Sequence, residues 1–113
     1  MHPLAFVLCI LIVSISSAQA GFVDGNELSD LCASYEANTT DPARSETALF
    51  REASCVYYII RSADATNYCP PEGVTSENII HIVIQYMDQH PSEGHLDAAQ
   101  LIQRALTEQF PCP

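Results

Sequence analysis

The side chains with the clearest chemistry in this chain are the four cysteines that follow residue 20: Cys32, Cys55, Cys69 and Cys112. The first two are equidistant from a predicted turn at residues 41–44, and the last two from one at residues 90–91. Residues equidistant from the turn of an antiparallel helical hairpin lie side by side, within the Cα separation of about 4.4–6.8 Å that a disulfide needs. The spacing therefore favours two disulfides, Cys32–Cys55 and Cys69–Cys112.

Four cysteines allow three connectivities, and the sequence alone does not decide among them. A Cys55–Cys69 bond would also require the end of the second predicted helix to fold back. Each favoured bond should remove about 3–4 kcal/mol of conformational freedom from the unfolded chain. The alternative is a zinc site, but the chain has no Cys-x2-Cys spacing, and an exported protein seldom keeps free thiols.

Three histidines lie where they could bind a metal ion: His90 and His95 flank the second turn, and His81 lies on the preceding helix. A metal site would need a further ligand, for which Glu93 or Asp97 could serve. We instead expect His90 and His95 to support the turn by hydrogen bonds to the backbone near Pro91 and Ser92. No nucleophile–base arrangement is left once the cysteines are paired, so we expect no enzyme, metal or cofactor.

The N-terminal segment predicts export. Residues 4–15 form an apolar run interrupted only by Ser14, and Ala18-Gln19-Ala20 provides the small residues of a cleavage site. A membrane anchor is the alternative, but the run is too short and lacks flanking charge. We therefore expect a signal peptide over residues 1–20, which includes Cys9, and one small domain over residues 21–113 in the periplasm or outside the cell.

The charge of the chain restricts the possible partners. It has 14 acidic and 4 basic residues, a formal net charge of −10, and no lysine. Such a balance opposes binding to nucleic acid and to anionic membranes, and it favours a basic surface on a protein partner. High solubility is the simpler explanation of the same composition.

Proline, glycine and capping residues divide the chain into four predicted helices, at about 26–37, 42–63, 76–90 and 93–109. Asp41 and Pro42 should begin the second helix, and Thr75 or Ser76 the third. The third is apolar on more than one face, which suits a central core helix or a dimer interface; residues 79–84 alone could equally form a strand. The predicted fold is all-α, a four-helix domain of two antiparallel hairpins with two disulfides.

The second helix should bury one stripe of apolar residues, and the fourth should bury another. The expected stripe on the second helix is Leu49, Ala53, Val56 and Ile60, with Cys55 and Ile59 beside it. The expected stripe on the fourth helix is Ala98, Leu101, Ile102, Ala105 and Leu106. Of the adjacent Tyr57 and Tyr58, one should face the core and the other solvent or a partner.

These landmarks together resemble the Rap/Tai family of immunity proteins, which protect bacteria against type VI secretion amidase effectors. The resemblance is carried by Asp24–Leu28 with Cys32, Cys55–Ile59, Tyr68–Thr75, Tyr86–Pro91 and Phe110–Cys112, together with His95, Ala99, Leu101, Ala105 and Leu106. It implies a small helical periplasmic protein, usually a homodimer, that occludes the active cleft of a peptidoglycan-cleaving amidase. The chain departs from the family at Arg61-Ser62, where a glycine is usual.

Inhibition by occlusion requires a protruding loop, and residues 90–95 suit that role because Pro91 stiffens them and Glu93 gives them an acid. The predicted partner-binding residues are Asp88, Gln89, Ser92, Glu93 and Gly94. The alternative function is a general periplasmic helper, such as a small helical acid-stress chaperone that exposes apolar surface when its carboxylates are protonated. A eukaryotic secreted protein on the same scaffold would instead make use of the Asn-x-Thr sequon at Asn38.

Overall fold

The computed structural model describes residues 23–37 and 45–113. Four α-helices and one short 3-10 helix make up these ranges: α2 Gly25–Ala37, α3 Glu46–Asp64, α4 Ser76–Gln89, η1 Pro91–Glu93 and α5 Ala98–Gln109. The only β pairing within them is an isolated bridge between Asp24 and Asp97. The all-α prediction is confirmed, and residues 79–84 are helical rather than a strand. The predicted signal peptide and the Asn38 sequon lie outside the described residues.

Side-chain caps explain where all four α-helices begin. At the start of α2, the Asp24 side chain accepts a hydrogen bond of 2.8 Å from the Glu27 amide. The Ser45 side chain accepts a hydrogen bond from the Ala48 amide at the start of α3, and Asp97 accepts one from the Ala99 amide at the start of α5. At the start of α4, Thr75 and Asn78 form a reciprocal capping box. The prediction of Thr75 is thus confirmed. Asp41 and Pro42 lie outside the described residues, and the described cap of α3 is Ser45.

The last helix begins later than the sequence suggested. Pro91 ends α4 as expected, but residues 91–93 form one 3-10 turn, and α5 begins only at Ala98. The intervening residues make backbone contacts with the start of α2 instead of continuing a helix. Arg61 and Ser62, where the chain departs from the family pattern, lie inside α3, which continues to Asp64.

The core is centred on α4, which buries five apolar residues: Ile79, Ile80, Val83, Ile84 and Met87. The stripe predicted for the last helix is confirmed, because all five of its members on α5 are buried. From α2 the core receives Leu28 and Cys32. The third predicted helix, α4, is therefore the central core helix, which was one of the two roles considered for it.

The prediction for α3 was wrong about the centre of the buried side, although Val56 and Ile60 of the predicted stripe are half-buried against the core. The buried residues are Cys55, Ile59 and Ala63, whereas Leu49 is 45% exposed. The core-facing stripe lies roughly 90° around the helix from the predicted one, at 100° per residue. The bond between Cys55 and buried Cys32 turns this side of α3 inward. Tyr58 packs against the core while Tyr57 is exposed, as expected for one of the two.

Both predicted disulfides are present. Cys32–Cys55 joins α2 to α3 in the core, and Cys69–Cys112 joins the loop after α3 to the segment after α5, each with Cα atoms 5.0 Å apart. The second bond lies at the surface, beside a hydrogen bond from the Cys69 amide to the Phe110 carbonyl. The first bond therefore links two helices inside the core, and the second links two chain segments at the surface.

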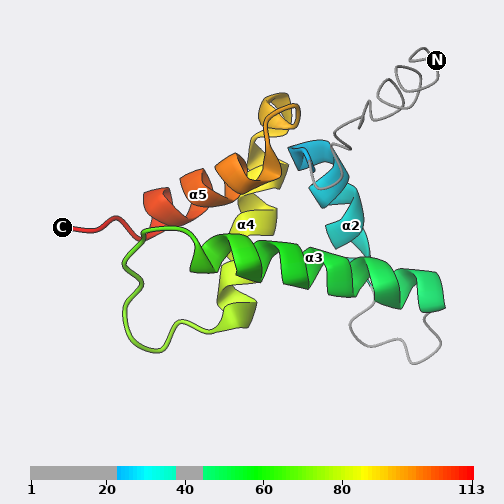
Figure 1. The fold of residues 1–113 in the computed structure, drawn as a ribbon, viewed down its shortest axis with the longest axis horizontal. Helices are drawn as coiled ribbons and strands as arrows, with labels where there is room; N and C mark the ends of the chain where they lie inside the picture. Colours follow the sequence, from blue (N-terminus) through cyan, green and yellow to red (C-terminus); the bar gives the residue numbers. More distant parts are fainter. Residues whose placement is uncertain (1–22, 38–44) are drawn as a thin grey trace, which may run out of the picture.

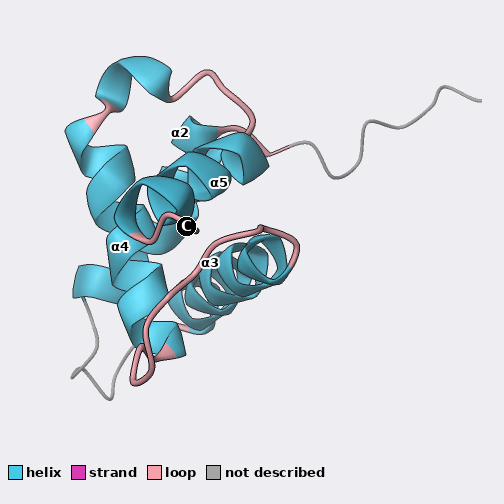
Figure 2. Ribbon diagram, turned by 90° about the vertical axis from the view of Figure 1, so that its left-hand side faces the viewer, coloured by secondary structure: helices cyan, strands magenta, loops and turns pink. Residues whose placement is uncertain are grey.

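The helices pack mainly in the pairs α2 with α3 and α4 with α5, with α3 also against α4 and α5. Within each pair the two helices are inclined to each other (Figure 1). Figure 2 views α3 along its axis while α4 runs across it, so α4 crosses α3. The packing of the helices leaves the α4–α5 turn at one end of the domain (Figure 1).

None of the described helices is sufficiently long and apolar to cross a bilayer.

Candidate functional site

The candidate site is the turn between α4 and α5, residues 88–97, whose backbone is held by successive local hydrogen bonds. The His90 amide donates to the Met87 carbonyl at 3.2 Å, and the Glu93 amide donates to the His90 carbonyl at 3.0 Å. The Leu96 amide then donates to the Glu93 carbonyl at 2.9 Å. The turn is therefore compact and has a defined shape before it meets any partner.

Three backbone hydrogen bonds attach this turn and the first residue of α5 to the start of α2 and to Val23, which precedes it. The Gly25 amide donates to the Leu96 carbonyl at 2.9 Å, the Asn26 amide to the Gly94 carbonyl at 3.0 Å, and the Ala98 amide to the Val23 carbonyl at 2.8 Å. A Cβ on Gly94 would lie 2.1 Å from Asn26 Oδ1. Any side chain at this position would therefore displace the Asn26 side chain, which lies against the backbone of the turn.

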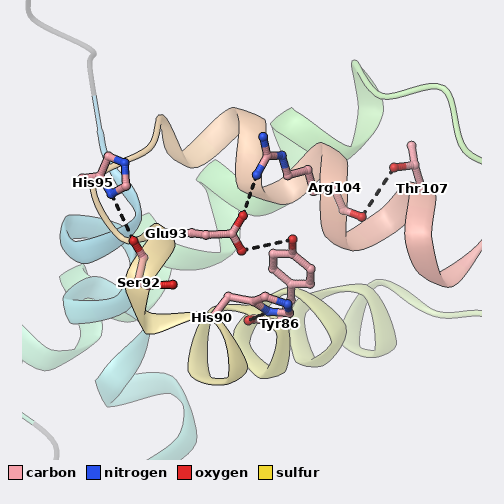
Figure 3. Close-up of polar contacts among 7 residues, drawn as sticks. All are labelled: Tyr86, His90, Ser92, Glu93, His95, Arg104 and Thr107. Atoms are coloured by element: carbon pink, nitrogen blue, oxygen red, sulfur yellow. Dashed lines mark hydrogen bonds and ion pairs between the residues drawn. The ribbon is translucent and has the colours of Figure 1, made fainter.

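Glu93 joins the turn to both flanking helices (Figure 3). One carboxylate oxygen forms an ion pair with Arg104 on α5, and the other accepts a hydrogen bond of 3.4 Å from the Tyr86 hydroxyl on α4. Burial raises the pKa of Tyr86, and the negative charges of Glu93 and Glu108 raise it further. Tyr86 therefore stays protonated at neutral pH and can donate to Glu93. This contact fixes an acidic side chain against the scaffold.

Both histidines of the turn bind backbone carbonyls: His95 does so at Ser92, as predicted, but His90 does so at Tyr86, on α4 rather than near Pro91. His95 Nδ1 lies 3.1 Å from the Ser92 carbonyl oxygen, and His90 Nδ1 lies 2.7 Å from that of Tyr86. The His90 ring also stacks on Tyr86, with centroids 3.9 Å apart. No group of three or more potential metal ligands occurs in residues 23–37 and 45–113. The histidines thus act in shaping the turn.

The structure places the predicted partner-binding residues at different depths. Asp88, Gln89 and Ser92 are exposed, Glu93 is half-buried, and Gly94 is buried. Gly94 therefore contributes through the close packing of the turn, and the first three offer side chains to a partner. A small cavity of about 190 Å³ between the turn and α2 includes Asp88 in its lining.

Sequence reasoning missed Arg104, Asn26 and Tyr86 as supports of the turn. The four-residue spacing of Tyr86 and His90 on a helix was an available signal for their stacking. Nothing in the sequence pointed to Arg104 or Asn26, because each reaches the turn from a different helix. Their roles arise from tertiary packing.

A scan against protein-family models matches the chain over residues 24–112 to the Rap1a immunity proteins. The chain belongs to this family. Membership of this family supports the function of an immunity protein that binds an effector of type VI secretion, and it agrees with the resemblance found in the sequence. The matched residues of this Rap1a family member include both disulfides and the whole turn. No curated protein matches the chain.

Proposed function

We propose that this chain is a periplasmic immunity protein that inhibits a peptidoglycan amidase effector by inserting the α4–α5 turn into its active cleft. The observation that carries the proposal is the construction of the turn. It lies between two helices, is attached to a third by backbone hydrogen bonds, and presents Asp88, Gln89 and Ser92 on its outside. A surface that is already ordered loses little conformational entropy on binding, which strengthens an inhibitory contact.

Charge supports the same partner class. The net charge of −10 and the exposed carboxylate of Asp88 at the turn suit an effector whose cleft has a basic rim, whereas the charge of Glu93 is paired with Arg104. Complementary charge would speed association at low salt, and the rate would fall as salt is added. The same charge opposes nucleic acid and anionic membranes as partners. This proposal needs no catalytic group on the inhibitor, which we take to be a non-enzyme.

The disulfides support the proposed compartment. Both pairs are bonded in the structure, and such bonds persist in oxidising compartments such as the bacterial periplasm. Export by the signal peptide at residues 1–20 would deliver the chain there, where peptidoglycan is attacked. We further propose that the mature protein acts as a homodimer.

The test is inhibition of the amidase encoded beside this gene, measured as release of cell-wall fragments with increasing amounts of oxidised inhibitor. Wild type should inhibit at a stoichiometric ratio. Asp88→Arg reverses a charge on the proposed contact, so its inhibition constant should rise about tenfold or more. Glu72→Arg makes the same charge change in the loop before α4 and should inhibit like wild type. Equal inhibition by both variants, or none by wild type, would refute the assignment of the turn.

One observation favours the alternative function of a periplasmic helper or acid-stress chaperone: three large apolar side chains of α3 are exposed, Leu49, Phe50 and Tyr57. A chaperone of this type should expose still more apolar surface on acidification. Binding of an apolar dye, titrated from pH 7 to about pH 3, separates the two functions. The immunity protein, held by two disulfides, should keep a constant dye signal, whereas a steep rise together with protection of a denatured client would favour the chaperone.

A further inference from the structure

The α3 face is an apolar surface on the outer side of α3, formed by Leu49, Phe50, Ala53, Val56, Tyr57 and Ile60. Phe50 is 71% exposed and Tyr57 is 66% exposed, which is unusual for side chains of this size. Between Leu49 and Ile60 the face is hollowed into an open groove of about 560 Å³. Exposed apolar patches of this kind commonly mark an interaction site.

The position of this face follows from how α3 is held. Cys55, Ile59 and Ala63 face the core, and the Cys32–Cys55 bond fixes the helix in that rotation. Within the face, Val56 and Ile60 are half-buried and pack partly against the core, whereas Leu49, Phe50, Ala53 and Tyr57 are exposed, so none of the described helices fully covers the face. Removing it from water requires either a partner molecule or residues outside the described ranges.

The order of residues on the face is self-complementary. In an antiparallel pair of α3 helices related by a two-fold axis between Val56 and Tyr57, residues equidistant from that point lie opposite each other. Ala53 and Ile60 are equidistant from it, so the small side chain of each copy meets the large side chain of the other, twice. Val56 and Tyr57 flank the axis on opposite sides. The two-fold rotation keeps both copies of Tyr57 on the same side, offset by only about 1.5 Å along the helices, so Tyr57 also meets its own equivalent and makes an aromatic pair.

Charge also favours a second copy of this chain. Two copies of net charge −10 repel each other, so they can associate only through a surface that is locally balanced. One acidic residue, Glu52, and one basic residue, Arg61, line the groove among its apolar residues. The Arg61 guanidinium lies 5.9 Å from the centre of the Tyr57 ring, so it borders the face. An effector with a basic rim would instead match the acidic turn.

The geometry points to the α3 face as the surface through which two copies of this chain form a two-fold symmetric dimer, an assignment that rests on the homodimer of the proposed function. Figure 1 and Figure 2 show the α4–α5 turn and α3 at separate parts of the domain. The two surfaces share no residue, so a dimer through α3 leaves both turns accessible. Each dimer can therefore present two inhibitory turns.

Sedimentation velocity of the oxidised exported protein across a dilution series tests this assignment in the absence of any effector. Tyr57→Lys places like charges next to the axis and next to Arg61 of both copies, so its dimer dissociation constant should rise about tenfold or more. Tyr57 is exposed, so the substitution should leave the fold and the core disulfide intact. Asp88→Arg, which changes the turn, should leave the dimer unchanged.

The decisive measurement mixes Tyr57→Lys with Tyr57→Glu. Because each residue 57 meets its own equivalent, the mixture should form mixed dimers in preference to either homodimer. A wild-type protein that is monomeric at all concentrations, or a Tyr57→Lys variant that dimerises like wild type, would overturn the assignment. So would a mixture without preferential pairing, since a different occupant of the face would give no such rescue. Failure of amidase inhibition leaves these results unaffected, so the two proposals fail separately.

Discussion

The two disulfides should differ in their contribution to stability, and in the opposite order to their loop lengths. The bonded residues are 23 apart in Cys32–Cys55 and 43 apart in Cys69–Cys112. The entropy of the unfolded chain alone gives the bonds about 3.4 and 4 kcal/mol respectively. On this basis, removing Cys69–Cys112 would cost more, by about 0.5 kcal/mol.

Burial reverses this order. Cys32 and Cys55 are 2% and 0% exposed and lie in the core, whereas Cys69 and Cys112 are both exposed. Replacing the buried pair by alanine removes two packed sulfurs, which adds roughly 1 kcal/mol at each position. We therefore expect Cys32→Ala/Cys55→Ala to lose about 5 kcal/mol and Cys69→Ala/Cys112→Ala about 4 kcal/mol.

The measurement is equilibrium unfolding in urea at pH 7, with both double variants and wild type compared without reductant. The buried bond should also resist a mild thiol reductant that opens the exposed bond, which mass spectrometry of alkylated thiols can follow. If the Cys69→Ala/Cys112→Ala variant is the less stable, the packing argument is wrong. Crosswise bonds in the exported protein would contradict the connectivity itself.

Three further predictions concern the turn and the tyrosines. Gly94→Ala should destabilise the domain by about 1 kcal/mol in urea unfolding, at the low end of overpacking costs, because its Cβ displaces the exposed Asn26 side chain. Wild-type stability would refute this close packing. In NMR titrations of the Tyr86 ring, Glu93→Gln should lower the pKa of Tyr86 and Arg104→Gln should raise it, since the two charges act on it in opposite directions; shifts of the same sign would contradict the network. Burial raises the pKa of three tyrosines: Tyr35, Tyr58 and Tyr86. Their pKa in the folded state lies above the unfolded value of about 10, so their contribution to the free energy of unfolding should be fully present below pH 10 and should be lost as pH rises through the folded pKa. Urea unfolding from pH 8 to pH 11 measures this loss, and a free energy that stays constant over that range would contradict it.

Helix number and type could be read from the sequence, because their causes are local. Proline, glycine and capping side chains act on the few residues beside them, so Thr75 and Pro91 marked the limits of α4 correctly. The five buried positions of α5 followed from the helical period alone. The disulfide pairs also followed from spacing, since equidistance from a turn is a property of the chain.

The rotation of α3 could not be read in the same way. Its sequence offers two apolar stripes, one through Leu49 and Ile60 and one through Cys55 and Ile59, and the helical period does not rank them. The structure selects the second because the bond to Cys32 and the packing of Ala63 fix which side meets α4 and α5. The residues predicted to be the buried stripe of α3 are instead part of the α3 face, which is mainly exposed.

The sequence by itself determined the helices, the acidic charge and the membership of an immunity family, and its spacing favoured the cysteine pairs that the structure confirms. Each of these features depends on neighbouring or regularly spaced residues. Only the tertiary structure decided that Gly94 is packed against Asn26, that Arg104 and Tyr86 hold Glu93, and that one apolar side of α3 remains exposed. These contacts join residues from separate helices. Their geometry depends on how inclined helices meet, which no local pattern in the chain specifies.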